Sequence, residues 1–145
     1  MSGVLIASIT ELCVADHQNV PKVVAGWTAN KTPEGVLALM NNMRHQAFVA
    51  ELDGEIAAVG LISADGTIGL NYVAPQFRFQ GVSRKLLAHM EDALCRTGTE
   101  VASLLSTQTA LVFYQEAGWV DAGPPQRGFT LVGYPMRKVL QVPVD

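Results

Sequence analysis

The stretch Val73-Ala-Pro-Gln-Phe-Arg-Phe-Gln-Gly-Val-Ser-Arg84 joins an apolar run to a helical pattern. The run before it, residues 68–73, is long enough for one buried strand. Beyond the turn, apolar residues recur at helical spacing, at Val82, Leu86, Met90 and Leu94. The sequence therefore predicts a strand that leads through a turn directly into an amphipathic helix, which ends near Gly98.

The amino-terminal end of such a helix is suited to an anion. Its first N–H groups have no partner within the helix, and the helix dipole makes this end positive. Gly81 lacks a Cβ, so the amides of residues 79–84 could hold a phosphate or pyrophosphate. The GxxxxGK[ST] and GxGxxG patterns of nucleotide sites are missing here. A glycine required only by a tight turn is the alternative interpretation.

Two Asp-Gly turns divide the preceding segment into three predicted strands. Asp53-Gly54 separates residues 47–52 from residues 55–62, and Ala64-Asp-Gly66 comes before residues 67–73. Asp-Gly between apolar runs is a strong hairpin signal, because the tight turn needs positive φ at its central residues. The segment therefore predicts an antiparallel meander.

The other elements complete one expected domain over residues 1–145. Before the meander we expect a strand at 4–7, a helix starting near Thr10, and a helix capped by Thr32 with Pro33 at its first position. After the long helix we expect a strand at 101–105, a helix at 110–117, and strands at 119–121 and 134–140. A strand, helix and strand in succession imply one parallel pair in a mostly antiparallel sheet, which makes the fold class α/β of the α+β type.

Composition excludes several classes of function. The 145 residues are 49% hydrophobic and 16% charged, with a net charge of −3, which indicates a folded domain without a nucleic-acid or anionic-membrane partner. Cys13 and Cys95 lie in apolar helical patterns, so we expect buried small hydrophobic residues and no metal site. No apolar run reaches about 18 residues and no basic region precedes the first apolar residues, so we expect a soluble, cytoplasmic protein.

Two motifs resemble the GCN5-related N-acetyltransferase (GNAT) superfamily. Val73-Ala-Pro75 followed by Arg78-Phe-Gln-Gly81-Val-Ser83 matches V-x-P-x-x-[RQ]-x-x-G-x-[GA], except at Ser83. Ala110-Leu-Val-Phe-Tyr-Gln-Glu-Ala-Gly-Trp119 matches A-x-x-[FL]-Y-x-x-x-G-F, with Trp119 in place of phenylalanine. The resemblance implies a single-domain GNAT fold, with helices on both faces of the sheet and the parallel strand pair splayed around the cofactor.

The resemblance implies acetyl-CoA as the cofactor. In that family the loop amides hold the pyrophosphate, and the preceding strand binds the pantetheine arm. Residues 71–73 would lie beside the thioester, where a bulge would open the strand pair. Thr107 stands where many members carry an asparagine that helps hold the cofactor. The implied cofactor-binding residues are Tyr72, Val73, Arg78, Phe79, Gln80, Gly81, Val82, Ser83, Arg84, Thr107 and Tyr114.

The implied reaction is direct attack of a primary amine on the thioester. Tyr114 matches the family's general acid, which protonates the coenzyme sulfur, and a tyrosine packed in the core is the alternative. At pH 7 only about one lysine-type amine in 10³–10⁴ is neutral, so a base or a desolvating pocket is needed. The strand at 67–73 contains no carboxylate or histidine. Glu51 is the candidate base, with a solvated surface glutamate as the alternative, and His45 and His89 are weaker candidates.

Acceptor specificity is expected to come from the first two helices and the loop at 123–129. Trp27 and Phe129 are candidate pocket residues, or core residues. The lack of an acidic patch favours a small-molecule or amino-acid-like amine over a basic protein tail. A non-catalytic acyl-CoA-binding regulatory module is the alternative function. The strand at 134–140 could extend the sheet of a partner in a homodimer, although Pro135 and Lys138 would equally protect an edge.

Overall fold

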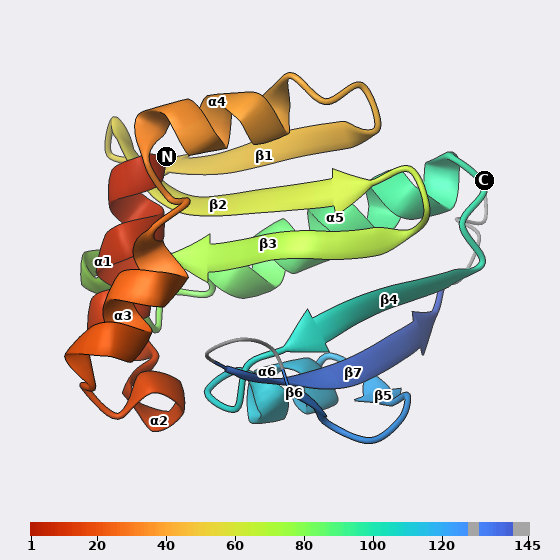
Figure 1. The fold of residues 1–145 in the computed structure, drawn as a ribbon. Coiled ribbons are helices and arrows are strands. Elements are labelled where there is room, and N and C mark those ends of the chain that lie inside the picture. The colour runs from red at the N-terminus through yellow and green to blue at the C-terminus, as the bar shows by residue number, and fades with distance from the viewer. Residues whose placement is uncertain (128–130, 141–145) are drawn as a thin grey trace.

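A seven-stranded mixed sheet forms the centre of the computed structural model, which describes residues 1–127 and 131–140. The path of the sheet is β1-β2-β3-β4-β7-β5, and β6 pairs with β7 (Figure 1). The strands are β1 (His45–Leu52), β2 (Glu55–Ser63), β3 (Thr67–Val73), β4 (Val101–Ser106), β5 (Val120–Asp121), β6 (Gln126–Arg127) and β7 (Val132–Val139). The predicted meander is confirmed, because β1, β2 and β3 pair antiparallel in sequence order.

Helices cover both faces of the sheet, as predicted. They are α1 (Ser2–Leu12), α2 (Val14–His17), α3 (Pro21–Thr28), α4 (Pro33–Met40), α5 (Val82–Arg96) and α6 (Leu111–Glu116), with a 3-10 turn, η1, at Pro75–Phe77. In Figure 1, α1, α3 and α4 lie in front of the sheet or at its edge, and α5 lies behind it. One core forms between α5, α6 and the sheet, around Leu87, Met90 and Trp119. A smaller core joins α1 and α4 to the opposite face, around Leu5 and Val59.

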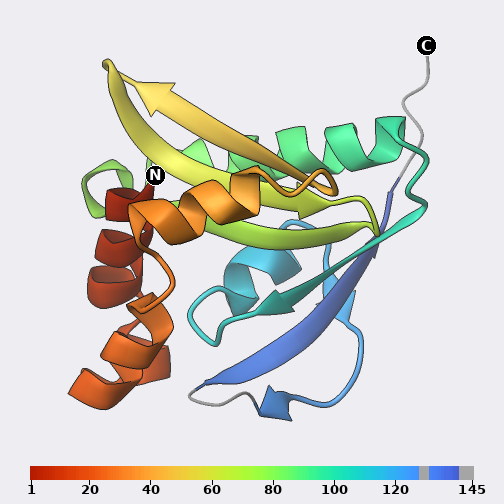
Figure 2. The ribbon, with the colours of Figure 1, turned by 45° about the horizontal axis from the view of Figure 1, so that its top comes forward.

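The parallel pair, β3 with β4, is very short. Thr67 is opposite Ser103 and Ile68 is opposite Leu104, and no further pair of these strands is recorded in the described part of the chain. Beyond these positions the two strands diverge (Figure 1 and Figure 2). The sheet is therefore open between β3 and β4 toward the carboxyl end of β3.

Residues 4–7, expected as a strand, lie instead within helix α1. Leu5, Ser8 and Ile9 are its buried residues, at the spacing of one helical face. A short apolar run fits a buried strand and a buried helical turn equally well, so periodicity alone could not separate them. Thr10, expected near a helix start, lies close to the end of α1. The chain therefore begins with four helices before its first strand.

The bulge expected at residues 71–73 lies two residues earlier. Leu61 pairs with Leu70 and Ile62 pairs with Ile68, which leaves Gly69 as the extra residue of β3. A bulge bends its strand and increases the local twist, and glycine adopts such a backbone at little cost. The bulge comes directly after the last β3 residue that pairs with β4. It therefore stands where the two strands separate.

Strand β7 is an interior strand and offers no long free edge for a partner chain. It pairs with β4 on one side through six positions, from Val101 opposite Val139 to Ser106 opposite Tyr134. Strands β5 and β6 pair with its other side. The expectation that a partner sheet could continue along 134–140 is therefore wrong for this chain. The β5 and β6 pairings were not predicted, because each involves only two residues.

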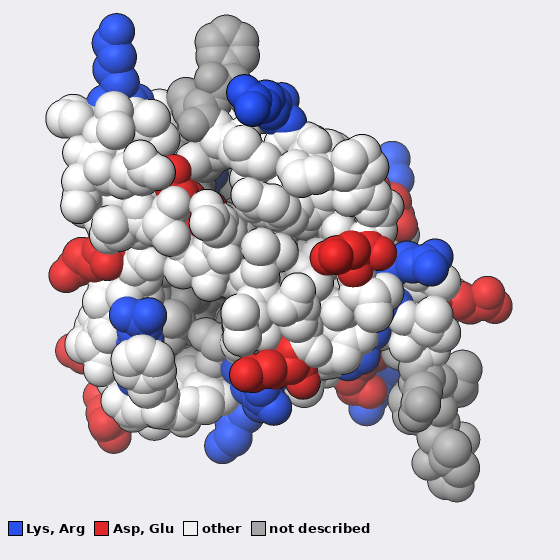
Figure 3. Space-filling view, turned by 90° about the horizontal axis from the view of Figure 1, so that it is seen from below, with Lys and Arg blue, Asp and Glu red and all other residues white. Residues whose placement is uncertain are grey.

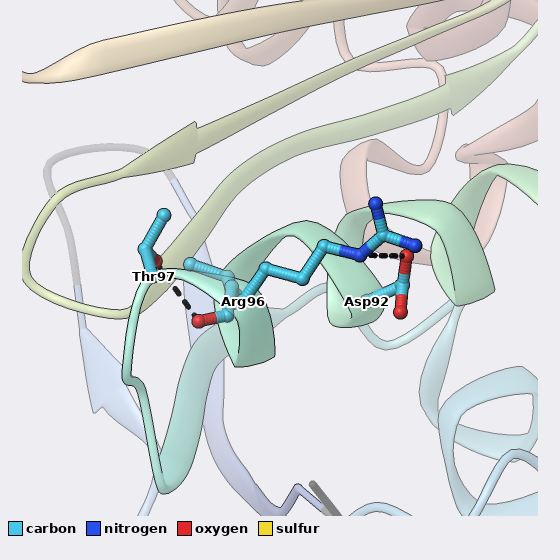
Figure 4. Close-up of polar contacts among 4 residues, drawn as sticks. Asp92, Arg96 and Thr97 are labelled. Atoms are coloured by element: carbon cyan, nitrogen blue, oxygen red, sulfur yellow. Dashed lines mark hydrogen bonds and ion pairs between the residues drawn. The ribbon is translucent and has the colours of Figure 1, made fainter. Parts of the chain in front are cut away.

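The local end signals of two helices act as predicted. Thr32 caps α4, since its Oγ1 accepts a hydrogen bond from the Gly35 N–H at 3.0 Å. At the end of α5, Arg96 Nε lies 3.0 Å from Asp92 Oδ2, and Thr97 Oγ1 donates to the Leu94 carbonyl oxygen at 2.9 Å (Figure 4). Gly98 follows with a φ of 93°. These contacts fix the carboxyl-terminal end of α5. The first turn of the same helix borders the site described below.

Three further features concern the sequence expectations. Cys13 is buried, as expected, while Cys95 is only partly buried. Among the described residues, no group of three or more His, Cys, Asp or Glu side chains is arranged to hold a metal ion. Over the same residues, no helix has both the length and the apolar character needed to cross a membrane.

His17 joins the first two helices from a fully buried position. Its Nδ1 accepts the Asn19 N–H at 3.0 Å, so Nε2 carries the proton and donates to the Ile9 carbonyl oxygen at 2.8 Å. The ring also meets Trp27 edge-on, with centroids 6.2 Å apart. The imidazole therefore hydrogen-bonds one backbone group in α1 and one in the turn after α2. The sequence alone does not show this connection.

We predict that His17→Leu lowers the free energy of unfolding by about 1–3 kcal/mol, because the Asn19 N–H loses its partner. Urea denaturation followed by circular dichroism measures the change. His89→Leu is the matched control. His89 is exposed on α5, so its replacement should change stability by about 0.5 kcal/mol or less. Equal losses in the two variants would contradict a structural role for the His17 hydrogen bonds.

Candidate active site

A cavity of about 450 Å³ lies where α1, the end of β3, the start of α5 and the start of α6 meet. This volume is within the range of small-molecule sites. The protein face viewed from below in Figure 3 is hollowed, and most of its surface is uncharged. The residues lining the cavity are Ser8, Leu12, Cys13, Asn71, Tyr72, Val73, Phe77, Arg78, Phe79, Gly81, Val82, Ser83, Arg84, Thr107, Thr109, Ala110, Phe113 and Tyr114.

The first turn of α5 presents free backbone amides to this cavity. Gly81 is the N-cap with a φ of 77°, and no side chain caps the helix. The first helical hydrogen bond runs from the Lys85 N–H to the Gly81 carbonyl oxygen at 3.2 Å, so the N–H groups of residues 82–84 precede it. A Cβ built on Gly81 meets no atom within 4 Å. The space beside these amides is open, as a phosphate-binding turn requires.

Two arginines lie beside the cavity, and one of them is paired, since Arg84 Nη2 is 3.8 Å from Glu116 Oε2. Arg78 and Arg84 both line it, and the Arg78 guanidinium lies 4.4 Å from the centroid of the Phe79 ring. Phe79 has a φ of 66°, which is uncommon for a residue with a side chain, and it is 89% exposed. Gln80 is exposed, its Nε2 donates to the Gln76 carbonyl oxygen, and it does not line the cavity. The structure therefore brings together all the predicted cofactor-binding residues except Gln80.

A second, smaller cavity of about 50 Å³ occupies the opening between β3 and β4. It is bounded by residues 68–72 on one side and by residues 104–106 on the other. Asn71, Tyr72, Thr107, Ala110 and Tyr114 border both cavities. The splayed parallel pair expected from the resemblance is thus confirmed, and its opening continues directly into the larger cavity.

Tyr114 borders both cavities at this junction. The side chain is buried against the edges of the Phe113 and Trp119 rings. Burial raises the pKa of Tyr114 to about 12, although a hydrogen bond from Asn71 opposes the rise. Asn71 Nδ2 donates to the Tyr114 hydroxyl oxygen at 3.2 Å. The phenol therefore keeps its proton at neutral pH, and its O–H is left to donate to another group.

Asp16 fastens helix α2 to the loop that follows β4. Its carboxylate accepts hydrogen bonds from the Gln108 N–H at 2.6 Å, from the Thr109 N–H at 3.0 Å and from the Thr109 hydroxyl. In the same loop, Thr107 Oγ1 accepts the Ala110 N–H at 3.2 Å at the start of α6. These contacts hold the amino-terminal helices beside the cavity. Sequence reasoning missed Asp16, because its partners lie more than 90 residues away.

Burial changes the chemistry of two other lining residues. It raises the pKa of the Cys13 thiol to about 12, so this cysteine stays protonated and is a poor nucleophile. The pKa of Tyr72 is also raised, mainly by burial, and the indole of Trp27 hydrogen-bonds its phenol. Trp27 is buried beside Ile9 and Cys13. Phe129, the other candidate acceptor residue, lies outside the described residues.

The candidate bases lie away from the cavity. Glu51 is exposed on β1, at the edge of the sheet. His45 begins β1, and its Nδ1 is 3.0 Å from the Leu39 carbonyl oxygen. His89 is exposed on α5, with its ring edge-on to Phe48. Among the described residues that line the two cavities, none is a carboxylate or a histidine.

We predict that Gly81→Ala weakens binding of coenzyme A, the cofactor implied by the motifs, by about tenfold or more. Alanine disfavours the positive φ of Gly81 and places a methyl group in the open space beside the free amides. Isothermal titration with coenzyme A measures the dissociation constant.

Gly54→Ala is the matched control for this variant. Gly54 has the same φ of 77° and equally open surroundings, but it lies in the β1–β2 turn. Each variant should lose about 1–2 kcal/mol of stability, while Gly54→Ala should keep normal affinity. Unchanged affinity in Gly81→Ala would contradict the proposed anion-binding turn.

Solved structures share the fold over nearly the whole chain. A GCN5-related N-acetyltransferase from Rhodopseudomonas palustris aligns with a TM-score of 0.84 at 20% identity, covering 96% of this chain and 87% of that one. The PaiA N-acetyltransferase of Thermoplasma acidophilum, solved with coenzyme A, aligns with a TM-score of 0.79 at 15% identity, covering 95% and 89%. The ribosomal-protein-S18-alanine N-acetyltransferase of Escherichia coli aligns with a TM-score of 0.65 at 18% identity, covering 97% and 90%.

The comparison of sequences covers a similar span. No curated protein sequence matches the chain. The family profile described as an acetyltransferase (GNAT) domain matches residues 13–140, which include both motifs and every element from α2 to β7. Family membership, together with related structures solved with coenzyme A, confirms the predicted cofactor, acetyl-CoA. The chain belongs to the GNAT acetyltransferase family.

Proposed function

We propose that this protein is an acetyl-CoA-dependent N-acetyltransferase that acts on a primary amine by direct attack on the thioester. The observation that carries the proposal is the junction of the two cavities at Tyr114. The open strand edge and the protonated phenol meet there, and the free helix amides line the larger of the two cavities. Family membership supports acetyl transfer in general.

The residues that line the larger cavity fit acetyl-CoA. We propose that the amides of residues 82–84, with Arg78 and Arg84, hold its phosphates, since a helix start and two guanidinium groups favour anions. Beyond Ile68, β3 has no recorded pairing with β4 within the described chain, so its backbone edge at residues 71–73 is available to the amide groups of pantetheine. When bound, acetyl-CoA supplies a thioester whose carbonyl carbon an amine can attack.

Tyr114 is proposed to donate its O–H to the leaving sulfur. A thiolate has a reference pKa near 8.5, so a hydrogen bond or one proton is enough to help it leave. Burial raises the pKa of the phenol, and the same desolvation would raise that of a thiolate in this apolar site. Burial therefore does not make proton donation from the Tyr114 phenol to the leaving thiolate less favourable.

The protein supplies no carboxylate or histidine at the proposed reaction centre, among the residues described. We therefore propose that the amine loses its proton to water and attacks in its neutral form. Glu51 is given no role in the transfer, because it is exposed on the far edge of the sheet. The same lack of a base favours the second candidate function, a non-catalytic acyl-CoA-binding regulatory module.

A small or amino-acid-like amine is the proposed acceptor. On the face seen in Figure 3, acidic side chains are spread singly and form no large patch for a basic protein tail. Asp16 holds α2 against the loop at 108–109, and Thr109 of this loop lines the cavity. The names of structural neighbours indicate varied acceptors, including an alanine of ribosomal protein S18, spermidine and an aminoglycoside.

The decisive experiment measures cofactor binding and coenzyme A release together. Acetyl-CoA should raise the melting temperature, and at least one amine should release free thiol only when the protein is present. The panel contains spermidine, an aminoglycoside, lysine and a peptide with an amino-terminal alanine. No thermal shift would contradict the proposal. A shift without thiol release from any amine would favour the regulatory module.

We predict that Tyr114→Phe lowers kcat by about 10²-fold, because the leaving sulfur loses its proton donor, while affinity for coenzyme A changes by less than about threefold. Steady-state kinetics and titration calorimetry measure the two quantities. Tyr134→Phe is the control, since Tyr134 on β7 borders neither of the two cavities. Equal kcat values in the two variants would contradict the role of Tyr114.

The pH dependence should follow the acceptor and not the protein. We predict that kcat/KM rises tenfold per pH unit up to the pKa of the amine itself, because no lining base competes for its proton. No fall should occur up to about pH 9.5, since the pKa of Tyr114 is about 12 and the phenol stays protonated. Profiles for two amines of different pKa test this. If the rise in kcat/KM ends at the same pH for both amines, the titrating group is a base on the protein and not the amine.

A further inference from the structure

Asn71 is a polar side chain within the apolar strand β3, and it borders both cavities. Its Nδ2 is used, because it donates to the Tyr114 hydroxyl oxygen at 3.2 Å. Its Oδ1 is buried and has no hydrogen-bond partner among the described residues. A buried amide oxygen without a donor destabilises the protein, so an unpartnered one beside a cavity indicates a missing ligand group.

The other buried polar atom without a partner provides a contrast. Trp119 Nε1 also lacks an acceptor in the described structure, but Trp119 is packed in the core and borders neither cavity. Of these two atoms, only Asn71 Oδ1 belongs to a residue that borders the cavities in the described part of the chain. The ligand group must carry an N–H or O–H donor, because an amide oxygen only accepts.

We propose that Asn71 Oδ1 binds the acceptor amine, while Nδ2 of the same side chain holds the Tyr114 phenol. This inference rests on the proposed function. In that reaction the amine nitrogen and the leaving sulfur flank one carbonyl carbon. The two polar atoms of a single planar amide can therefore serve the nucleophile and the acid together. Asn71 would be an anchor for the amine and a positioning residue for Tyr114.

The chemistry of the amide suits this task. An amide oxygen accepts a hydrogen bond from a neutral amine and from the more positive nitrogen that forms during attack. It does not remove a proton, so the proton leaves through water. A carboxylate in the same buried position would carry a desolvated charge beside the phenol. The lack of carboxylates and histidines along the described cavity walls means that no such group competes for the amine.

Asn71→Leu tests the proposal, because leucine has a similar size but offers neither polar atom. We expect the KM of the amine to rise about tenfold or more, with the dissociation constant of coenzyme A changed by less than about threefold. Titration of each panel amine into protein saturated with coenzyme A should show the same loss of amine affinity, without turnover. Asn41→Leu, at an exposed asparagine after α4, is the matched control and should behave as the wild type.

Two further variants separate the two contacts. Asn71→Asp keeps an acceptor oxygen and should retain amine affinity while kcat falls, because the donor to Tyr114 is lost. In the Tyr114→Phe background, Asn71→Leu should still weaken the amine about tenfold. If it has no further effect there, Asn71 acts only through Tyr114 and the amine contact is overturned. A loss confined to coenzyme A affinity would also overturn it, by assigning Oδ1 to a cofactor N–H.

The two proposals fail in different ways. If wild-type protein releases no coenzyme A with any amine, the proposed function fails, while calorimetry of the amine on the coenzyme A complex still measures the Asn71 contact. If no amine binds that complex, the Asn71 proposal is overturned as well. Melting temperatures of all variants show which of them fold. If Asn71→Leu does not fold, Asn71→Asp is the variant that is compared with the wild type.

Discussion

In the part of the chain that the structure describes, strands β3 and β4 pair at only two positions, and the site depends on this limit. Thr67 with Ser103 and Ile68 with Leu104 join two antiparallel units, β1–β3 and β4–β7. Directly after Ile68, the bulge at Gly69 alters the course of β3. Helix α5 packs against β1, β2 and β3, while its last turn leads into β4. The sheet therefore stays continuous at the amino end of β3 and opens at its carboxyl end. Helix α5 keeps β1, β2 and β3 packed in the core.

The opening has an electrostatic character that favours one mechanism. Arg78, Arg84 and the start of α5 make one end positive, which suits an anionic cofactor. Burial raises the pKa values of Tyr114 and of Cys13, which also line this cavity. A protonated Cys13 is a poor acetyl carrier, so the walls favour direct attack by the amine over a covalent acetyl-cysteine.

The features that local chemistry determines could be predicted from the sequence. The Asp-Gly turns, the Thr32 cap and the glycine at the start of α5 each act through residues a few positions away. Helix α1 could not be separated from a strand, because only packing against β2 and β3 decides which conformation a short apolar run adopts. Most of the predicted cofactor-binding residues lie in one continuous stretch, which a local motif can identify. Asp16 and Asn71 act on residues 92 and 43 positions away, which no local pattern reveals.

An amide at the centre of the site, in place of a carboxylate, would favour some amines over others. Without a base, the rate depends on the neutral fraction of the amine. At pH 7 that fraction is about 10⁻¹ for a peptide α-amino group and about 10⁻³–10⁻⁴ for a lysine side chain. The difference of about 10²-fold or more would outweigh most differences in hydrogen bonding, since each tenfold step corresponds to about 1.4 kcal/mol. An Asn71-anchored site would therefore be best matched to amines of low pKa, such as a peptide α-amino group, over lysine-type amines.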